Sequence, residues 1–315
     1  MRLLLLSLWA VASLSAAVAD FNGRWILSVQ GDPRGRVWWL KIAGAGTPKV
    51  QGEFVGAPGG QLDPVPKIAV HGNELIWEFQ SATQPGVYRA RVEGGKLTGN
   101  LDVAGKVTRT FGGSHAPEIT DVDDGKWMKQ KAVELFNGRD LNGWRVTVPN
   151  RSIDEWKIDG GAMKNGVGKA PDIASEQKFW NFDLHIEFRV GHHSNSGVGL
   201  RGRYEVQIYG DQGEAPSKHS NGALYSRIAP AVNATLAPEA WQSFDIRFIG
   251  REVTVVLNGK KLIEKKDVEG YTAMATDPNE DQPGPLMLQG DHGPVEFRKV
   301  TVTPLVRGGS NHSTP

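Results

Sequence analysis

The sequence predicts an all-β protein with two domains, and three observations support this prediction. Short segments alternate apolar and polar residues through most of the chain, as half-buried strands do. The chain contains 39 glycines and 18 prolines, so turns should be frequent. No segment carries a sustained helical period. We therefore expect a small antiparallel β domain followed by a larger domain of two packed sheets.

The N-terminus predicts export. Arg2 precedes an apolar run that ends in Ala17-Val18-Ala19, the small-x-small pattern of a signal peptidase site. We expect residues 1–19 to be a signal peptide, Asp20 to start the mature chain, and the protein to be periplasmic or secreted. An uncleaved anchor is the alternative. No later segment is apolar enough to span a membrane.

Composition limits the classes of partner. The net charge is +1, so no basic field points to nucleic acid or to an anionic membrane surface. The chain has no cysteine, so disulfides cannot stabilise it. Ten tryptophans are many, and tryptophan serves both in cores and on sugar-binding faces.

Residues 20–115 predict a small β-barrel or sandwich of six to eight strands, for example at 36–42, 74–79 and 88–92. This segment gathers no catalytic side chains, and we interpret it as an accessory domain. Acids then accumulate while the apolar periodicity fades, which predicts a linker over 116–131.

Residues 132–306 resume the strand pattern and predict the sandwich. Clear strands are expected at 182–190, 242–248 and 252–257, the last followed by an Asn258-Gly259 hairpin turn. We expect residues 307–315 to be a disordered tail.

Two strand patterns place polar side chains on one face. Glu187 and Arg189 oppose the apolar residues of their strand, and Glu205, Gln207 and Tyr209 oppose Val206 and Ile208. If these faces line one concave side together with Arg201, they form a polar groove suited to a sugar. The alternative is an ordinary solvated sheet face with cross-strand Glu–Arg pairs.

His292 follows Gln289 where a strand runs into a turn. Loops on rigid scaffolds often carry function, and histidine transfers protons near neutral pH. A histidine that only hydrogen-bonds to the turn backbone is the alternative.

Several ordered blocks resemble a known family. They include Glu134 through Trp144, Asn195-Ser196-Gly197-Val198, Tyr204 through Ile208, and Leu288 through Arg298. Together they resemble the 3-keto-disaccharide hydrolase domain, formerly a domain of unknown function, over about residues 132–306. One departure is Lys299, where an asparagine is common. The resemblance implies a concanavalin-like jelly-roll sandwich.

The resemblance also implies a reaction on a small oxidised sugar or glycoside. A ketone at C3 acidifies the C2 hydrogen, so a base can form an enolate that expels the C1 substituent, and water addition completes a net hydrolysis. The catalytic candidates are Glu205 or His292 as base, with Arg201, Arg189 or a divalent metal stabilising the oxygen. No cofactor is certain. The substrate-binding candidates are Glu187, Arg189, Asn195, Gln207, Tyr209 and Gln289.

Two other routes remain open at the level of sequence. Glu187 and Glu205 could act as the paired carboxylates of an ordinary glycosidase. The domain could instead be a noncatalytic, lectin-like sugar-binding module, or a structural protein of the cell envelope if the polar groove is absent.

Overall fold

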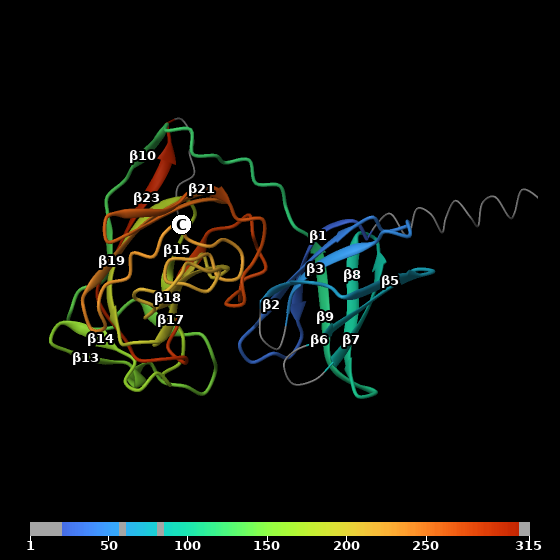
Figure 1. The fold of residues 1–315 in the computed structure, drawn as a ribbon, viewed down its shortest axis with the longest axis horizontal. Helices are drawn as coiled ribbons and strands as arrows, with labels where there is room; N and C mark the ends of the chain where they lie inside the picture. Colours follow the sequence, from blue (N-terminus) through green and yellow to red (C-terminus); the bar gives the residue numbers. More distant parts are fainter. Residues whose placement is uncertain (1–20, 57–60, 81–84, 309–315) are drawn as a thin grey trace, which may run out of the picture. The chain divides into compact units, whose positions relative to one another are not determined.

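The structure is a computed structural model that describes residues 21–56, 61–80 and 85–308. The predicted signal peptide and most of the predicted tail lie outside these residues. Contacts divide the chain into two compact units between Pro117 and Glu118 (Figure 1). Both units are all-β, as predicted, and the described helical structure is one 3₁₀ turn, η1 (Ile153–Glu155).

In the N-terminal unit, each strand pairs antiparallel with its neighbours in one sheet of the order β4-β3-β2-β1-β9-β8-β7-β6-β5. The nine strands described there are β1 (Gly23–Val29), β2 (Val37–Ala43), β3 (Gln51–Val55), β4 (Leu62–Pro64), β5 (Lys67–His71), β6 (Glu74–Gln80), β7 (Pro85–Glu93), β8 (Lys96–Val103) and β9 (Lys106–His115).

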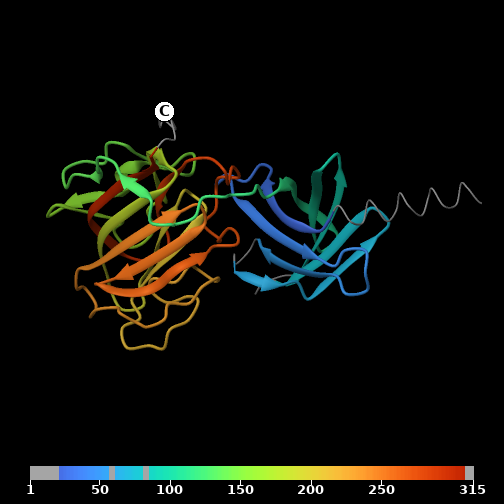
Figure 2. The ribbon, with the colours of Figure 1, turned by 90° about the horizontal axis from the view of Figure 1, so that it is seen from above.

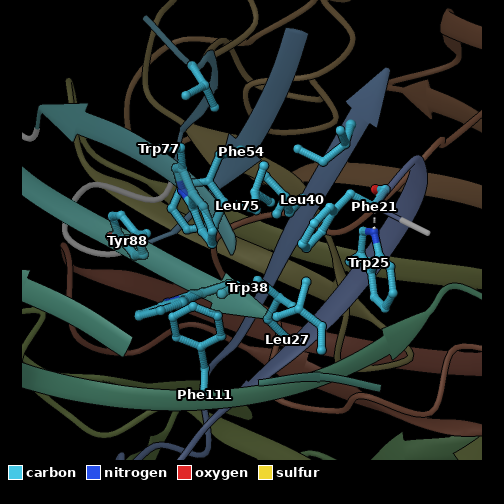
Figure 3. Packing of buried hydrophobic residues seen from close by; sticks show 14 of the residues in the cluster. Phe21, Trp25, Leu27, Trp38, Leu40, Phe54, Leu75, Trp77, Tyr88 and Phe111 are labelled. Carbon is cyan, nitrogen blue, oxygen red and sulfur yellow. Dashed lines mark hydrogen bonds between the residues drawn. The ribbon is translucent and has the colours of Figure 1, made fainter. Parts of the chain in front are cut away.

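This sheet curls around an aromatic core. The Phe54 ring on β3 lies 5.6 Å from the Trp77 ring on β6, and Trp77 stacks on Tyr88 of β7 at 4.9 Å. Figure 3 shows these rings with Trp38 and Phe111 in one cluster. Strands from both halves of the sheet therefore share one interior, which is a barrel-like arrangement.

In the C-terminal unit, the described strands form two sheets. The larger has the order β13-β14-β23-β16-β19-β20-β21, with β10 and β11 also pairing with β23, and the smaller has the order β12-β15-β22-β17-β18. The strands of the larger sheet are β10 (Trp127–Lys129), β11 (Val133–Phe136), β13 (Lys157–Asp159), β14 (Ala162–Lys164), β16 (Phe182–Val190), β19 (Gln242–Ile249), β20 (Glu252–Leu257), β21 (Lys260–Asp267) and β23 (Val295–Arg307). Those of the smaller sheet are β12 (Trp144–Val146), β15 (Ile173–Phe179), β17 (Asn195–Leu200), β18 (Tyr204–Tyr209) and β22 (Gly284–Leu288).

The sequence pattern explains how these sheets pack. β16 alternates buried and half-buried residues along its whole length, so one face enters the core. Asn258 and Gly259 adopt positive φ between β20 and β21, as the predicted hairpin requires. Figure 2 shows β19 to β21, in orange, side by side in the larger sheet. The Tyr204 ring of β18 lies 5.3 Å from Phe248 of β19, so the two sheets face each other across a shared core.

Part of the segment predicted to be a linker belongs to the C-terminal unit. Asp121 accepts hydrogen bonds from Trp180 Nε1 and Asn181 Nδ2, both at 2.8 Å, and Asp123 pairs with Arg247 at 2.9 Å. β10 continues this attachment along β23. These acids lack apolar periodicity because they attach through ion pairs and hydrogen bonds instead of burial.

Within the described part of the chain, no helix has the length and apolar character needed to traverse a bilayer.

Candidate functional site

Glu205 lies on β18, at the edge of the smaller sheet, on the face that points away from the core. Its neighbours Tyr204 and Val206 are fully buried between the sheets, so alternation turns Glu205 outward. Two segments hydrogen-bond to the outer edge of its strand: Glu205 N–H donates to Thr272 Oγ1 at 2.9 Å, and Tyr225 N–H donates to Glu205 O at 3.0 Å. Glu205 is only 3% exposed although it faces away from the core.

The strand beside it leaves room for the carboxyl group. A Cβ at Gly197 of β17 would lie 2.5 Å from Glu205 Oε1, so a side chain at this position would displace the carboxyl. Gln207, two residues along β18, lies with its amide 3.1 Å from Asn195 Oδ1 and 3.2 Å from Glu205 Oε1. With its nitrogen turned toward Glu205, this amide donates to the carboxyl and to Ser196 O. Glycine and amide together fix where the carboxyl lies.

The loop between β22 and β23 brings His292 to the same site. Asp291 contacts His292 Nδ1 through its carboxylate, which leaves Nε2 as the other titrating atom of the ring. Asn165 holds this loop: its Nδ2 donates to Gly290 O at 2.9 Å and to Gly293 O at 2.7 Å, and its Oδ1 accepts from Val295 N–H at 2.8 Å. Asp172 accepts from Gly290 N–H at 2.9 Å.

The electrostatics of this cluster differ for the acid and the imidazole. Burial raises the pKa of Glu205 to about 8, and the nearby His292 opposes this rise. The hydrogen bond that His292 Nδ1 donates to the Asp291 carboxylate raises the pKa of His292 above its ordinary value, and the charges of Asp291, Glu205 and Asp172 add to this effect. The backbone also connects the two residues: Gln289 N–H, at the start of the His292 loop, donates at 3.0 Å to the carbonyl of Gly197, the glycine that faces Glu205.

Arg201, predicted to be catalytic, lies elsewhere. It adopts a positive φ of 54° after β17, and its guanidinium lies 3.9 Å from the Trp180 ring and 4.2 Å from Phe248, in the core between the sheets. Its Nε donates to Trp180 O at 2.6 Å. Burial lowers the pKa of Arg201 to about 9, and its charge interactions are with groups other than Glu205 and His292. We correct its predicted role from oxyanion stabiliser to core residue.

Glu187 is also separated from Glu205. It lies on the outer face of the larger sheet, where it contacts Arg298 Nε and His185, so the sandwich core lies between the two carboxylates. Glu187 and Glu205 therefore do not lie in one groove. The paired-carboxylate alternative, which needs both acids beside one sugar ring, loses its geometric basis.

The other predicted binding residues lie nearer to the site. Asn195 and Arg189 line the same cavity as His292. Gln289 is only 9% exposed, and its Oε1 has no hydrogen-bond partner within the described residues. The Tyr209 ring stacks on His193 at 5.8 Å, at the end of β18 beyond Gln207.

Asp172 and Asn165 were missed by sequence reasoning. Asp172 directly precedes the buried strand β15, and an acid in that position was the available signal. Asn165 lies in a glycine-rich turn without any pattern that marks it. Among the described residues, no group of three or more His, Cys, Asp or Glu side chains is arranged to hold a metal ion.

Comparison with known proteins adds a family match. The 3-keto-alpha-glucoside-1,2-lyase-like domain family matches residues 131–303. A 3-keto-disaccharide hydrolase from Bacteroides thetaiotaomicron is 34% identical over 74 residues, which are 21% of this chain and 26% of that protein. Its similarity to this chain thus spans about a quarter of its own length.

Two solved structures from Parabacteroides distasonis, both provisionally named glycosyl hydrolases, are also similar. One is 29% identical with a TM-score of 0.47 and covers 60% of this chain and 92% of its own. The other is 24% identical with a TM-score of 0.45, and the match covers 56% of this chain and 100% of that structure's chain.

Proposed function

Because the chain belongs to the 3-keto-alpha-glucoside-1,2-lyase-like domain family, we propose that it cleaves 3-keto-glycosides at the cluster around Glu205 and His292. The observation that carries this proposal is the pairing of a buried carboxyl, whose pKa is about 8, with a carboxylate-bound imidazole. Such a pair supplies an acid and a base at neutral pH, which an elimination needs at the same time.

His292 is assigned the role of base. Asp291 holds Nδ1, so Nε2 can take the C2 proton, whose acidity comes from the C3 ketone. The electron pair of the C2–H bond passes into the enolate. The imidazolium that forms lies beside this negative charge, and Asp291 stabilises the imidazolium.

Glu205 is assigned the role of acid. Burial keeps its proton on near neutral pH, so it can protonate the C1 oxygen as the bond from C1 to this oxygen breaks. The enolate collapses to a C1–C2 double bond conjugated with the ketone. Water then adds at C1, Glu205 takes a proton from this water, and His292 returns a proton to C2. The net reaction is hydrolysis.

The amides of the site suit sugar hydroxyl groups. The unpartnered Gln289 Oε1 would accept a hydrogen bond from one hydroxyl, and a buried acceptor left without a partner costs roughly 1–3 kcal/mol. The side-chain amides of Asn195 and Gln207 hydrogen-bond to each other beside Glu205.

The test is turnover of purified protein on a 3-keto-disaccharide and on the same disaccharide before oxidation. We expect sugar release from the oxidised substrate, far slower release from the unoxidised one, and losses of at least ~10²-fold for Glu205→Gln and His292→Ala. Glu53→Gln and His71→Ala in the N-terminal unit are the matched controls and should be near neutral.

Equal rates on both substrates would contradict the proposal. Binding without turnover would instead support the lectin-like alternative. We further propose that the protein is exported, on the basis of the Ala17-Val18-Ala19 pattern; sequencing the N-terminus of periplasmic or secreted protein should give Asp20, and Met1 would exclude cleavage.

A further inference from the structure

Two side-chain amides lie beside the Glu205 carboxyl, on two neighbouring strands of the smaller sheet. Gln207 follows Glu205 on β18, and Asn195 begins β17, which pairs antiparallel with β18. The Gln207 amide lies between the other two side chains, 3.2 Å from Glu205 Oε1 at one end and 3.1 Å from Asn195 Oδ1 at the other. Glu205 and Gln207 are both buried, so the protein itself must supply their hydrogen-bond partners.

The Gln207 amide fits this space in two orientations. In the first, Nε2 donates to Asn195 Oδ1 at 3.1 Å, and Oε1 faces Glu205 Oε1. In the second, the amide is turned by half a rotation, so Nε2 donates to Glu205 Oε1 at 3.2 Å and to Ser196 O at 3.3 Å, while Oε1 faces Asn195. Asn195 then turns its own amide, so that Nδ2 donates to Gln207 Oε1. Both orientations occupy the same space, because the terminal torsion of glutamine is roughly two-fold.

Each orientation suits one protonation state of Glu205. When the Gln207 oxygen faces Glu205 Oε1, it accepts a hydrogen bond from the protonated carboxyl, whereas two oxygens without a proton between them repel each other. When the Gln207 nitrogen faces Glu205 Oε1, it donates to the carboxylate, and this charge-assisted bond is the stronger of the two. The proton on Glu205 and the orientation of the two amides are therefore linked.

The rest of Gln207 is held in place. Its backbone N–H donates to Ala223 O at 2.9 Å, and its backbone oxygen accepts from Gly222 N–H at 2.8 Å. A response of Gln207 to the charge of Glu205 is thus confined to the end of its side chain.

Three charged groups act on the same carboxyl. Asp291 and His292 act on it from the loop between β22 and β23, and Asp172 from the position before β15. The two acids favour the protonated form of Glu205, and His292 favours the carboxylate. β17 presents Gly197 to the carboxyl, and the segment beyond the outer edge of β18 presents a threonine hydroxyl, neither of which carries a charge. The Gln207 amide differs from the charged groups because it is neutral and can hydrogen-bond to both forms.

We propose that Gln207 is a positioning residue that turns its amide, together with that of Asn195, each time Glu205 loses or regains its proton. This inference rests on the proposed function, in which Glu205 gives its proton to the C1 oxygen. As this proton leaves, the Gln207 nitrogen turns toward the carboxylate and stabilises its charge. When Glu205 takes a proton from water, the Gln207 oxygen turns back. Neither amide gains or loses a proton in this cycle.

The first test needs no substrate. The side-chain amide protons of the full-length protein, labelled with ¹⁵N-glutamine, are followed by NMR from about pH 6 to about pH 10, a range that spans the titration of Glu205. The Gln207 amide protons should show NOEs to the Asn195 side chain at low pH and to Glu205 Hγ at high pH, and Glu205→Gln should remove this pH dependence. NOEs that stay with Asn195 throughout, or a pH dependence that survives in Glu205→Gln, would overturn the proposal.

The second test uses turnover. Gln207→Leu should move the alkaline limb of kcat/KM up by about one pH unit, because the carboxylate loses a stronger hydrogen bond than the protonated form does. It should also lower kcat by about tenfold. Gln177→Leu, at an exposed position of β15, is the matched control.

The outcomes separate the two claims. An alkaline limb at the native position in Gln207→Leu would overturn the positioning role while leaving the role of Glu205 intact. A native enzyme that turns over no 3-keto-glycoside would overturn the proposed function, and the NMR measurement would still decide whether the two amides turn with the proton of Glu205.

Discussion

At the scale of single residues, burial sets Glu205 apart from the other acids around His292. Asp172 and Asp291 each hold a hydrogen bond that suits a carboxylate, from Gly290 N–H and from His292 Nδ1. Glu205 is buried, and no Lys or Arg among the described residues forms an ion pair with it, so its proton is retained to higher pH. His292 can therefore act as a base while Glu205, one of the acids beside it, stays protonated near neutral pH.

This difference predicts a bell-shaped dependence of kcat/KM on pH. His292 must be neutral to act as base, so the acid limb lies above the ordinary imidazole pKa of about 6.5. Glu205 must be protonated to act as acid, so activity falls as pH rises through about 8. Measuring kcat/KM from about pH 5 to about pH 10, a range that spans the titration of both groups, checks this prediction. Glu205→Gln should abolish the alkaline limb of its residual activity, and an unchanged limb would show that another group is the acid.

A second pH prediction isolates Asp291. Asp291→Asn should move the acid limb to lower pH, because it removes the carboxylate that raises the pKa of His292. It should also lower kcat, because the ring loses its orienting partner. Asp245→Asn is the matched control, since Asp245 contacts His185 Nδ1 at 2.7 Å on the outer face of the larger sheet. An acid limb that does not move would exclude Asp291 as the partner that tunes the base.

Arg201→Ala should affect stability more than catalysis. The change removes a fully buried side chain from between Trp180 and Phe248, and we expect roughly 2–4 kcal/mol loss in the free energy of unfolding. Urea denaturation measures this loss, with the exposed Arg145→Ala as control. If the variant keeps its stability and loses its activity, Arg201 belongs to the chemistry after all.

At the scale of elements, the site depends on how three loops converge. The 165–168 turn, the 290–294 loop and the 191–195 turn approach so closely that a Cβ at Gly168 would lie 2.4 Å from Gly293 C. Asn165 connects two of them through its three hydrogen bonds. The buried side-chain amide of Asn165 thus holds the loop that carries His292 against the sheets.

Asn165→Ala should loosen the His292 loop. Gly290 O and Gly293 O lose their donor, and we expect a cost of about 1–3 kcal/mol together with a lower kcat/KM. Hydrogen exchange should quicken at Val295, whose N–H donates to Asn165, and stay slow in β16. Asn142→Ala, on an exposed turn, is the control. Protection at Val295 equal to that of the native protein would contradict the role of Asn165 as a clamp.

The sequence predicted the elements better than their arrangement. The alternation over residues 182–190 corresponds to β16, and the Asn258-Gly259 turn lies where expected. Alternation separates two faces of a strand but does not say which sheet the strand joins. The alternation therefore predicts one groove for Glu187 and Glu205, although β16 and β18 belong to different sheets. Arg201 could not be placed because a positive-φ turn, invisible in the sequence pattern, directs its side chain into the core.

At the scale of the whole molecule, the acidic segment before β11 is an attachment of the C-terminal unit. Its backbone lies against Gly250, where a Cβ would be 2.0 Å from Asp121 O. Asp123 N–H also donates to Glu252 Oε2 at 2.5 Å. This strap explains why the contacts divide the chain at residue 117, before the acids, and not after them.

Two fragments test the division. Residues 118–308 should fold alone and keep the activity of the full chain, because all contacts of the site lie within this unit. Residues 130–308 should also fold but unfold at lower temperature, because they lack Asp121, Asp123 and β10. Thermal unfolding of both fragments measures the difference. Equal midpoints would show that the strap contributes nothing, and an insoluble 118–308 would show that the N-terminal unit is needed for folding.

The measurement that tests the central claim most directly is the fate of the C2 hydrogen in D₂O. If His292 removes this proton and Glu205 assists departure at C1, the imidazolium exchanges its proton with D₂O before the return step, and the released 3-keto sugar should carry one solvent deuterium at C2, visible by NMR at early times. His292→Ala should abolish both release and labelling, and incubation of the product without enzyme corrects for spontaneous exchange beside the ketone. A released sugar that keeps its original C2 hydrogen, together with an unchanged rate on a substrate deuterated at C2, would contradict the elimination and return the chemistry to direct displacement at C1.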